Sequence, residues 1–185
     1  FVGLRSFTEQ ESHLFFGREQ QVDELLLRLR QHHFLAVLGT SGSGKSSLIR
    51  AGLIPALKSG FMTQKGSNWE IVVCRVGDDP VLNLAKKLNQ KNILHIEEPQ
   101  AQSTQNSILK VKLERSDNAL ANVVKESRMP STDNLLIVVD QFEEIFISGE
   151  FDEKQQFIKE VSEIVQSKIK VKLIFSLREE YLAYM

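Results

Sequence analysis

At positions 39–46 the chain reads Gly39-Thr40-Ser41-Gly42-Ser43-Gly44-Lys45-Ser46, a complete match to the pattern G-x-x-x-x-G-K-[ST]. The apolar run Phe34–Leu38 precedes this stretch and indicates a buried strand, and the residues from Lys45 to about Lys58 favour a helix. A glycine-rich loop between a strand and a helix turns its backbone N–H groups inward, at the positive end of the helix. The stretch therefore predicts a phosphate-binding loop rather than an ordinary Gly/Ser turn with a chance lysine.

The residue types in this loop predict a nucleotide held together with a metal ion. We expect Lys45 to reach the β- and γ-phosphates and the hydroxyl of Ser46 to ligate Mg²⁺. The glycines let the backbone curl around the phosphates. The predicted nucleotide-contacting set in the loop is Gly39, Thr40, Ser41, Gly42, Ser43, Gly44, Lys45, Ser46 and Ser47.

An acidic residue follows the most apolar run of the chain. Leu135–Val139 reads as a strand buried on both faces, which places it near the middle of a parallel sheet. Asp140 would then emerge at the carboxyl edge of that sheet, where open α/β sheets bind their ligands. We expect Asp140 to hold the Mg²⁺ shell; the alternative is that Asp140 only caps the helix that follows.

Two further acids, Glu143 and Glu144, are candidates for the group that activates water. Hydrolysis of a phosphoanhydride needs a carboxylate that orients and deprotonates the attacking water. If the stretch Gln141–Phe146 is helical, its aromatic and aliphatic residues face the core and Glu143 flanks that face, whereas Glu144 points further away. Glu143 is the preferred base, and the alternative is that both acids are solvated at the surface.

Composition and charge exclude several classes of protein. Hydrophobic residues make up 42% and charged residues 25%, which is typical of a globular domain rather than a disordered chain. Lys and Arg total 23 against 24 Asp and Glu, so no global field favours nucleic acid or a membrane surface. The single cysteine, Cys74, cannot form an internal disulfide, and no apolar run approaches the ~20 residues of a membrane helix. We expect a cytoplasmic protein.

Strands and helices alternate along the chain, which predicts an α/β fold with a parallel sheet covered on both faces. The remaining predicted strands are Trp69–Arg75 and Val171–Leu177, and the remaining predicted helices are Arg18–Gln31, Pro80 to about Asn89, Ala119–Glu126 and Asp152–Gln166. The polar stretch Pro99–Ser107 predicts a loop. Residues 1–17 form a lead-in whose scattered phenylalanines suggest that it packs on the core, residues 18–185. The chain begins without Met and ends in a predicted helix, so we expect it to be part of a longer protein.

Several motifs together carry a resemblance to a known family. The segment Phe15-Phe16-Gly17-Arg18-Glu19 resembles the hhGRE motif of the STAND class of P-loop NTPases (signal-transduction ATPases with numerous domains). With Gly3-Leu4-Arg5, the phosphate loop continued to Pro55, and the box Asp140-Gln141-Phe142-Glu143-Glu144, the chain is similar to the bacterial novel STAND group over essentially its whole length. The segment Arg75–Pro80 resembles that group's Arg-Pro-Gly…Pro segment, with Val76 in place of Pro.

The resemblance implies a P-loop NTPase of ASCE/STAND type with three α/β/α layers and a mainly parallel sheet. It implies ATP with Mg²⁺ as ligands, Gly17, Arg18 and Glu19 beside the adenine and ribose, and Arg178 as the arginine that senses the γ-phosphate. From the residues alone, Gly17 and Glu19 could simply start a helix, and Arg178 could be a surface arginine. The resemblance further implies a signal-transduction switch, with C-terminal regulatory or repeat domains in the same protein and nucleotide-dependent homo-oligomers.

The family order of strands is 5-1-4-3-2, and only four strands can be counted here. We therefore expect the sheet to be truncated before the fifth strand, an open edge at Phe34–Leu38 that promotes self-association, and weak nucleotide binding with slow or no turnover by this piece alone. One alternative is a nucleotide-binding scaffold that does not hydrolyse ATP. Another is a DNA-associated AAA+-like ATPase, which Gln141 disfavours because that group carries Glu there. A small-molecule kinase is the most distant alternative.

Overall fold

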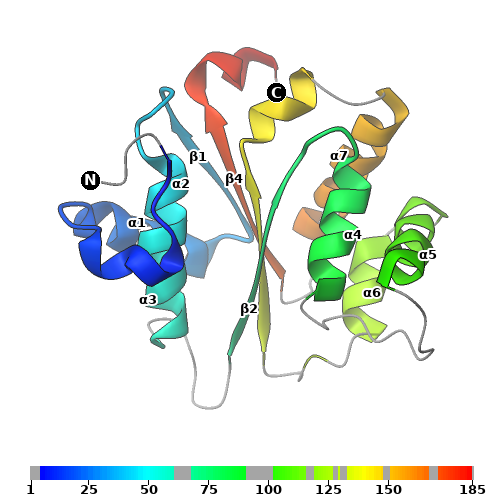
Figure 1. Cartoon of the computed structure of the whole chain (residues 1–185), viewed down its shortest axis with the longest axis horizontal. Coiled ribbons are helices and arrows are strands. Elements are labelled where there is room, and N and C mark those ends of the chain that lie inside the picture. Colours follow the sequence, from blue (N-terminus) through cyan, green and yellow to red (C-terminus); the bar gives the residue numbers. More distant parts are fainter. Residues whose placement is uncertain are drawn as a thin grey trace.

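The computed structural model describes residues 5–60, 68–90, 102–115, 119–126, 129, 133–147, 151–166 and 171–184. Within these residues the strands β1 (Phe34–Gly39), β2 (Trp69–Arg75), β3 (Asn134–Asp140) and β4 (Val171–Arg178) form one all-parallel sheet in the order β1-β4-β3-β2. The carboxyl ends of all four strands therefore meet at one edge, at the top of Figure 1.

Helices cover both faces of this sheet and complete three layers (Figure 1). One layer holds α1 (Glu19–Gln31), α2 (Lys45–Ser47), a π-helical turn η2 (Leu48–Leu53) and α3 (Ile54–Lys58). The other holds α4 (Pro80–Gln90), α5 (Gln102–Arg115), α6 (Ala119–Glu126) and α7 (Phe151–Gln166). Short 3₁₀ helices lie at Glu9–Leu14 (η1), Phe142–Phe146 (η3) and Glu179–Tyr184 (η4). None of the helices in the described ranges is long and apolar enough to cross a membrane.

The apolar residues of β3 divide between two hydrophobic cores. Leu136 and Val138 pack in the core with α1 and α3, and Leu135, Ile137 and Val139 pack in the core with α4 and α7. All five are at most 1% exposed. A strand buried on both faces by helices is what a parallel α/β sheet requires. The predicted α/β/α fold of P-loop type is confirmed.

The predicted loop Pro99–Ser107 is wrong over its described part, because residues 102–107 belong to α5; residues 99–101 lie outside the described residues. The polar composition of this stretch conceals its packing. Leu109 and Leu113, further along α5, are buried, and Asn89 of α4 donates hydrogen bonds to Gln105 and Asn106 of α5. Tertiary contacts with α4 therefore stabilise a helix whose first turns have weak helix propensity.

The predicted helix from Lys45 to Lys58 is present but contains a π-helical turn, Leu48–Leu53. Pro55, in the first turn of α3, has no N–H to donate to the carbonyl four residues earlier, which loosens the α-helical spacing there. A Cβ at Gly52, in the π turn, would lie 2.6 Å from Cγ2 of Val22 and 3.3 Å from Cε1 of Phe15. The absence of a side chain at Gly52 therefore allows the close approach of α1 and the lead-in.

The described part of the lead-in packs on the helix that follows the phosphate loop. The backbone N–H of Phe7 donates to Oγ of Ser47 (3.1 Å), and Lys58 pairs with Glu9 (2.6 Å). Phe7 and Phe15 stack edge to face, with ring centroids 5.8 Å apart. These contacts hold residues near the N-terminus beside the phosphate loop.

Candidate functional site

The loop between β1 and α2 has the backbone that its glycines predict. Gly42 and Gly44 adopt positive φ angles of 76° and 88°, which L side chains rarely tolerate. A Cβ at Gly39 would lie 2.8 Å from Oγ of Ser43. Lys45 lies across this loop, since its Nζ donates to the carbonyls of Gly39 (2.7 Å) and Thr40 (2.8 Å).

Asp140, at the end of β3, is 1% exposed and faces the first turn of the helix after the loop. Its Oδ1 accepts hydrogen bonds from the hydroxyls of Ser46 (2.7 Å) and Ser176 (2.6 Å), and its Oδ2 accepts one from Nη2 of Arg50 (3.1 Å). The cap residue of the following helix is Gln141, so Asp140 does not act as that cap. The structure thus brings together Ser46 and Asp140, which lie far apart in the sequence.

Two residues of this cluster, Arg50 and Ser176, are not among the predicted site residues. Arg50 lies four residues after Ser46, on the same face of the helix, so the i,i+4 spacing could have indicated a second group on Asp140. Ser176 lies two residues before Arg178 on β4, and its Oγ also accepts the backbone N–H of Gln141 (3.1 Å). Only the pairing of β4 with β3 reveals that contact.

Glu143 and Glu144 lie in different surroundings. Glu143 is 5% exposed; its Oε1 pairs with Nε of Arg178 (3.2 Å), while its buried Oε2 has no hydrogen-bond partner among the described residues. Oε2 of Glu144 instead accepts the backbone N–H of Gly77, beyond the end of β2 (3.1 Å). Arg178 also lies 3.5 Å from Glu180. Glu143 is therefore not a solvated surface acid, contrary to one of the alternatives above.

A cavity of about 820 Å³ opens at the carboxyl edge of the sheet, beside the loop. This volume is in the range of small-molecule and cofactor sites. The cavity is lined by Arg5, Ser6, Phe7, Leu14, Phe15, Phe16, Arg18, Ser41, Gly42, Gly44, Lys45, Ser46, Ser47, Arg75, Gln141, Glu143, Ser176 and Arg178. Loop, strand ends and lead-in therefore share one cavity, and Glu144 is not part of its lining.

The predicted Gly17-Arg18-Glu19 segment lies at the border of this cavity. Arg18 donates from Nη2 to the carbonyl of Ser43 (2.9 Å), which ties the segment to the loop. The N–H of Gly17 donates to Oε1 of Glu19 (2.9 Å). Hydrogen bonds from the backbone N–H groups of Glu19 itself and of Gly17 hold the pKa of the Glu19 carboxyl below its ordinary value. Glu19 starts α1 and lines a smaller neighbouring hollow together with Arg18.

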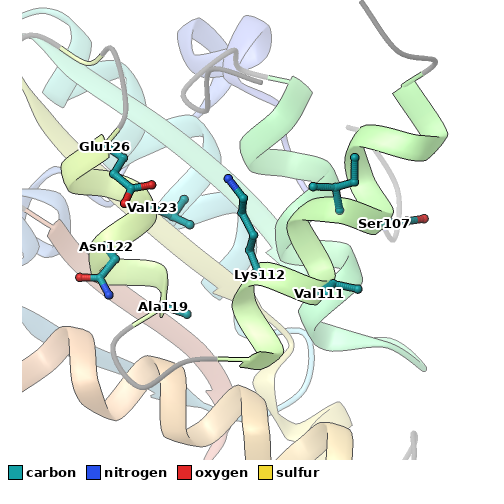
Figure 2. Close-up of a pocket in the computed structure, with 8 residues that line it drawn as sticks. Ser107, Val111, Lys112, Ala119, Asn122, Val123 and Glu126 are labelled. Carbon is teal, nitrogen blue, oxygen red and sulfur yellow. The ribbon is translucent and has the colours of Figure 1, made fainter. Parts of the chain in front are cut away.

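A second cavity, of about 710 Å³, lies between α5 and α6 and contains none of the predicted site residues. Figure 2 shows the side chain of Lys112, on α5, lying between this helix and Val123 of α6. Its lining is half aliphatic (Ile108, Val111, Ala119 and Val123) and half polar or charged (Ser107, Lys112, Asn122 and Glu126). Within the described residues, no group of three or more His, Cys, Asp or Glu side chains is arranged to hold a metal ion, here or elsewhere.

Comparison with known proteins adds one finding to this geometry. A search of curated proteins and a search of solved structures each found no match. The family model described as Novel STAND NTPase 1 matches residues 1–185, which is the whole chain. The parallel sheet, the glycine-rich loop after β1 and the acid at the end of β3 agree with that match. The chain therefore belongs to the Novel STAND NTPase 1 family.

Proposed function

We propose that this NTPase module binds ATP with Mg²⁺ and hydrolyses it, and that the nucleotide sets the state of a signal-transduction switch. The observation that carries the proposal is the 2.7 Å hydrogen bond between Ser46 and Asp140, which joins the end of the phosphate loop to the acid of β3 beside the large cavity. A hydroxyl and a carboxylate in this arrangement, with phosphate oxygens, suit Mg²⁺, which prefers oxygen ligands and keeps several waters.

The phosphates are bound by the loop and by Lys45. In the structure, Nζ of Lys45 donates to two carbonyls of the loop itself, Gly39 and Thr40. Phosphate oxygens are stronger acceptors for an ammonium than neutral carbonyls, so bound phosphate draws the lysine toward itself. Ser46 and Asp140 are the protein groups that would hold Mg²⁺, which supplies positive charge against the charge that develops on the phosphates.

Glu143 is the proposed general base. Its Oε1 is held by Arg178, and its Oε2 is buried without a donor, so that oxygen is available to accept a proton from water. The water oxygen attacks the γ-phosphorus, the bond to the β-phosphate oxygen breaks, and its electrons leave with ADP. Arg178 is placed beside both the base and the cavity, which supports its proposed role in sensing the γ-phosphate.

The nucleoside end of ATP is assigned to the part of the cavity formed by the lead-in and Arg18, in line with the family resemblance. Aromatic side chains such as Phe7 and Phe16 line this part of the cavity and offer apolar surface for a purine. Regulatory domains in a longer protein and nucleotide-dependent homo-oligomers remain part of the same proposal.

Single-turnover hydrolysis tests this assignment, because protein in excess over ATP reveals even slow chemistry. Glu143→Gln should reduce the rate by roughly 100-fold or more while ATP stays bound, because the amide cannot accept the proton. Glu144→Gln is the matched control: its amide oxygen still accepts the N–H of Gly77, and the rate should stay within about two-fold.

Equal rates for the Glu143→Gln variant and the unaltered chain would contradict the base assignment. Tight ATP binding with no hydrolysis by the full-length protein would instead favour the non-hydrolysing scaffold. Stimulation of hydrolysis by DNA would favour the AAA+-like alternative.

A further inference from the structure

Arg75, the last residue of β2, is an exposed arginine that lines the same cavity as the phosphate loop. The other cationic side chains of the lining already have partners within the chain. Arg5 pairs with Glu11, Arg18 donates to Ser43, Lys45 donates to loop carbonyls, and Arg178 pairs with Glu143. The guanidinium of Arg75 has no hydrogen bond or ion pair to any residue in the described ranges. It is therefore the lining cation whose donors the described protein leaves unused.

The backbone that carries Arg75 is fixed on both sides. Before it, β2 pairs with β3 along its whole length, which sets Arg75 directly opposite Asp140. After it, Val76 is fully buried, its carbonyl accepts a hydrogen bond from Asn83 (2.8 Å), and the N–H of Gly77 is held by Glu144 (3.1 Å). Conformational freedom is thus confined to the Arg75 side chain.

The sheet order defines which part of a bound nucleotide Arg75 can reach. The phosphate loop follows β1, at one side of the sheet, and β2 is the strand at the other side, with β4 and β3 between them (Figure 1). Neighbouring strands lie about 5 Å apart, so an extended arginine on β2 can reach over the end of β3, where Asp140 lies and after which η3 carries Glu143. The phosphates nearest the loop are beyond its reach.

We propose that Arg75 binds the terminal phosphate of a nucleoside triphosphate and so makes the site distinguish triphosphate from diphosphate. The inference rests on the proposed function, because it requires that the cavity hold a nucleotide. Five cationic side chains against one carboxylate in the lining favour a polyanion, and a guanidinium is suited to bidentate contact with phosphate oxygens. Lys45 approaches the phosphate chain from the loop side and Arg75 from the opposite side.

Calorimetric titration with two probes tests this inference: Mg²⁺ with the non-hydrolysable triphosphate AMP-PNP, and Mg²⁺ with ADP. Arg75→Gln should weaken AMP-PNP binding by roughly ten- to hundred-fold, the loss expected for a charge-assisted hydrogen bond, and change ADP binding by about two-fold at most. Arg75→Lys, which keeps the charge, should recover part of the AMP-PNP affinity. Arg30→Gln, at an exposed arginine of α1, is the matched control and should leave both affinities unchanged.

The outcomes separate the inference from the function on which it rests. Suppose that the unaltered chain binds both probes. If Arg75→Gln then lowers the two affinities equally, or leaves both unchanged, the inference is overturned and the proposed function stands. If the unaltered chain binds neither probe, the proposed function is overturned, and the inference with it. Unchanged thermal unfolding of Arg75→Gln shows that a selective loss of AMP-PNP binding reports on the contact rather than on the fold.

Discussion

Asp140 is a buried carboxylate whose charge is balanced inside the protein by Arg50. Both of its oxygens accept hydrogen bonds, and the pair with Arg50 links β3 to the helix after the phosphate loop. Breaking a buried ion pair by removing one partner is costly because the other charge stays buried without compensation. Arg50 therefore supports the position of a proposed site residue without belonging to the lining of the cavity.

Arg50→Met should lower the free energy of unfolding by about 1–3 kcal/mol, less than for a fully buried pair because the Arg50 side chain is 33% exposed. In a protein that already carries Asp140→Asn, Arg50→Met should lower the free energy of unfolding clearly less, because no buried carboxylate then remains without its cationic partner. Urea unfolding of the two single variants and the double variant measures this coupling. If the decreases in the free energy of unfolding of the two single variants simply add up to that of the double variant, the predicted coupling between Arg50 and Asp140 is contradicted.

Also at the scale of residues, the sequence predicts a role for a residue when that residue belongs to a motif. It does not predict a role that depends only on how the residue packs in the fold. The sequence assigns Ser46 and Asp140 separately to a Mg²⁺ ion, and the structure brings the two side chains within hydrogen-bond distance of each other. Arg50 and Ser176 carry no motif of their own. Their contacts depend on the pairing of strands and on the helix face presented to β3, which a single sequence does not state.

At the scale of elements, two neighbouring side chains of α7 connect this helix to α5 and α6. Glu160 is 2% exposed and accepts the N–H of Leu120 at the start of α6 (3.0 Å). Gln156 donates both to Glu160 (2.9 Å) and to the carbonyl of Leu113 near the end of α5 (3.0 Å). The bounds of α6 were predicted correctly, but the first turns of α5 were not, because contacts with distant elements such as α4 and α7 stabilise that helix.

Burial raises the pKa of the Glu160 carboxyl, against the opposing effect of the Leu120 N–H. The folded protein then binds this proton more tightly than the unfolded chain, so the contribution of Glu160 to stability is largest at low pH and is lost as the pH rises through the raised pKa. Glu160→Gln removes this titrating group. The decrease in the free energy of unfolding of the variant, relative to the unaltered chain, should therefore be smaller at about pH 7.5 than at about pH 5. Urea unfolding at both pH values measures this difference, and Glu126→Gln, at an exposed position of α6, is the control. An equal decrease in the free energy of unfolding of Glu160→Gln at the two pH values would contradict the prediction.

At the scale of the whole molecule, the two helical layers bring the carboxyl ends of β1, β3 and β4 to one edge of the sheet. The order β1-β4-β3-β2 agrees with the order predicted for the counted strands. In the described structure β1 lies at the side of the sheet and pairs only with β4. One face of β1 is buried, whereas Ala36 and Leu38 on its other face are exposed. An exposed edge of this kind is open to pairing, and self-association remains a prediction.

The fold could be predicted from the sequence because its strands are apolar, short and bounded by clear breaks. The predicted strand Trp69–Arg75 coincides with β2, and the other three differ from the observed strands by a residue or two. The cavity could not be predicted in the same way. It depends on the lead-in, which returns to the phosphate loop through contacts such as Phe7 with Ser47, and on the position of Arg75 relative to Asp140.

The central claim is that the loop after β1 and the acid after β3 hold ATP with Mg²⁺, and calorimetric titration of ATP into this chain, with and without Mg²⁺, tests it most directly. The unaltered chain should bind ATP in a Mg²⁺-dependent way. Lys45→Ala should lower the affinity by roughly ten- to hundred-fold, because it removes a charge-assisted contact to phosphate, whereas Lys86→Ala, at an exposed lysine of α4, should leave it unchanged. Equal ATP affinity for the unaltered chain and for Lys45→Ala would contradict the account.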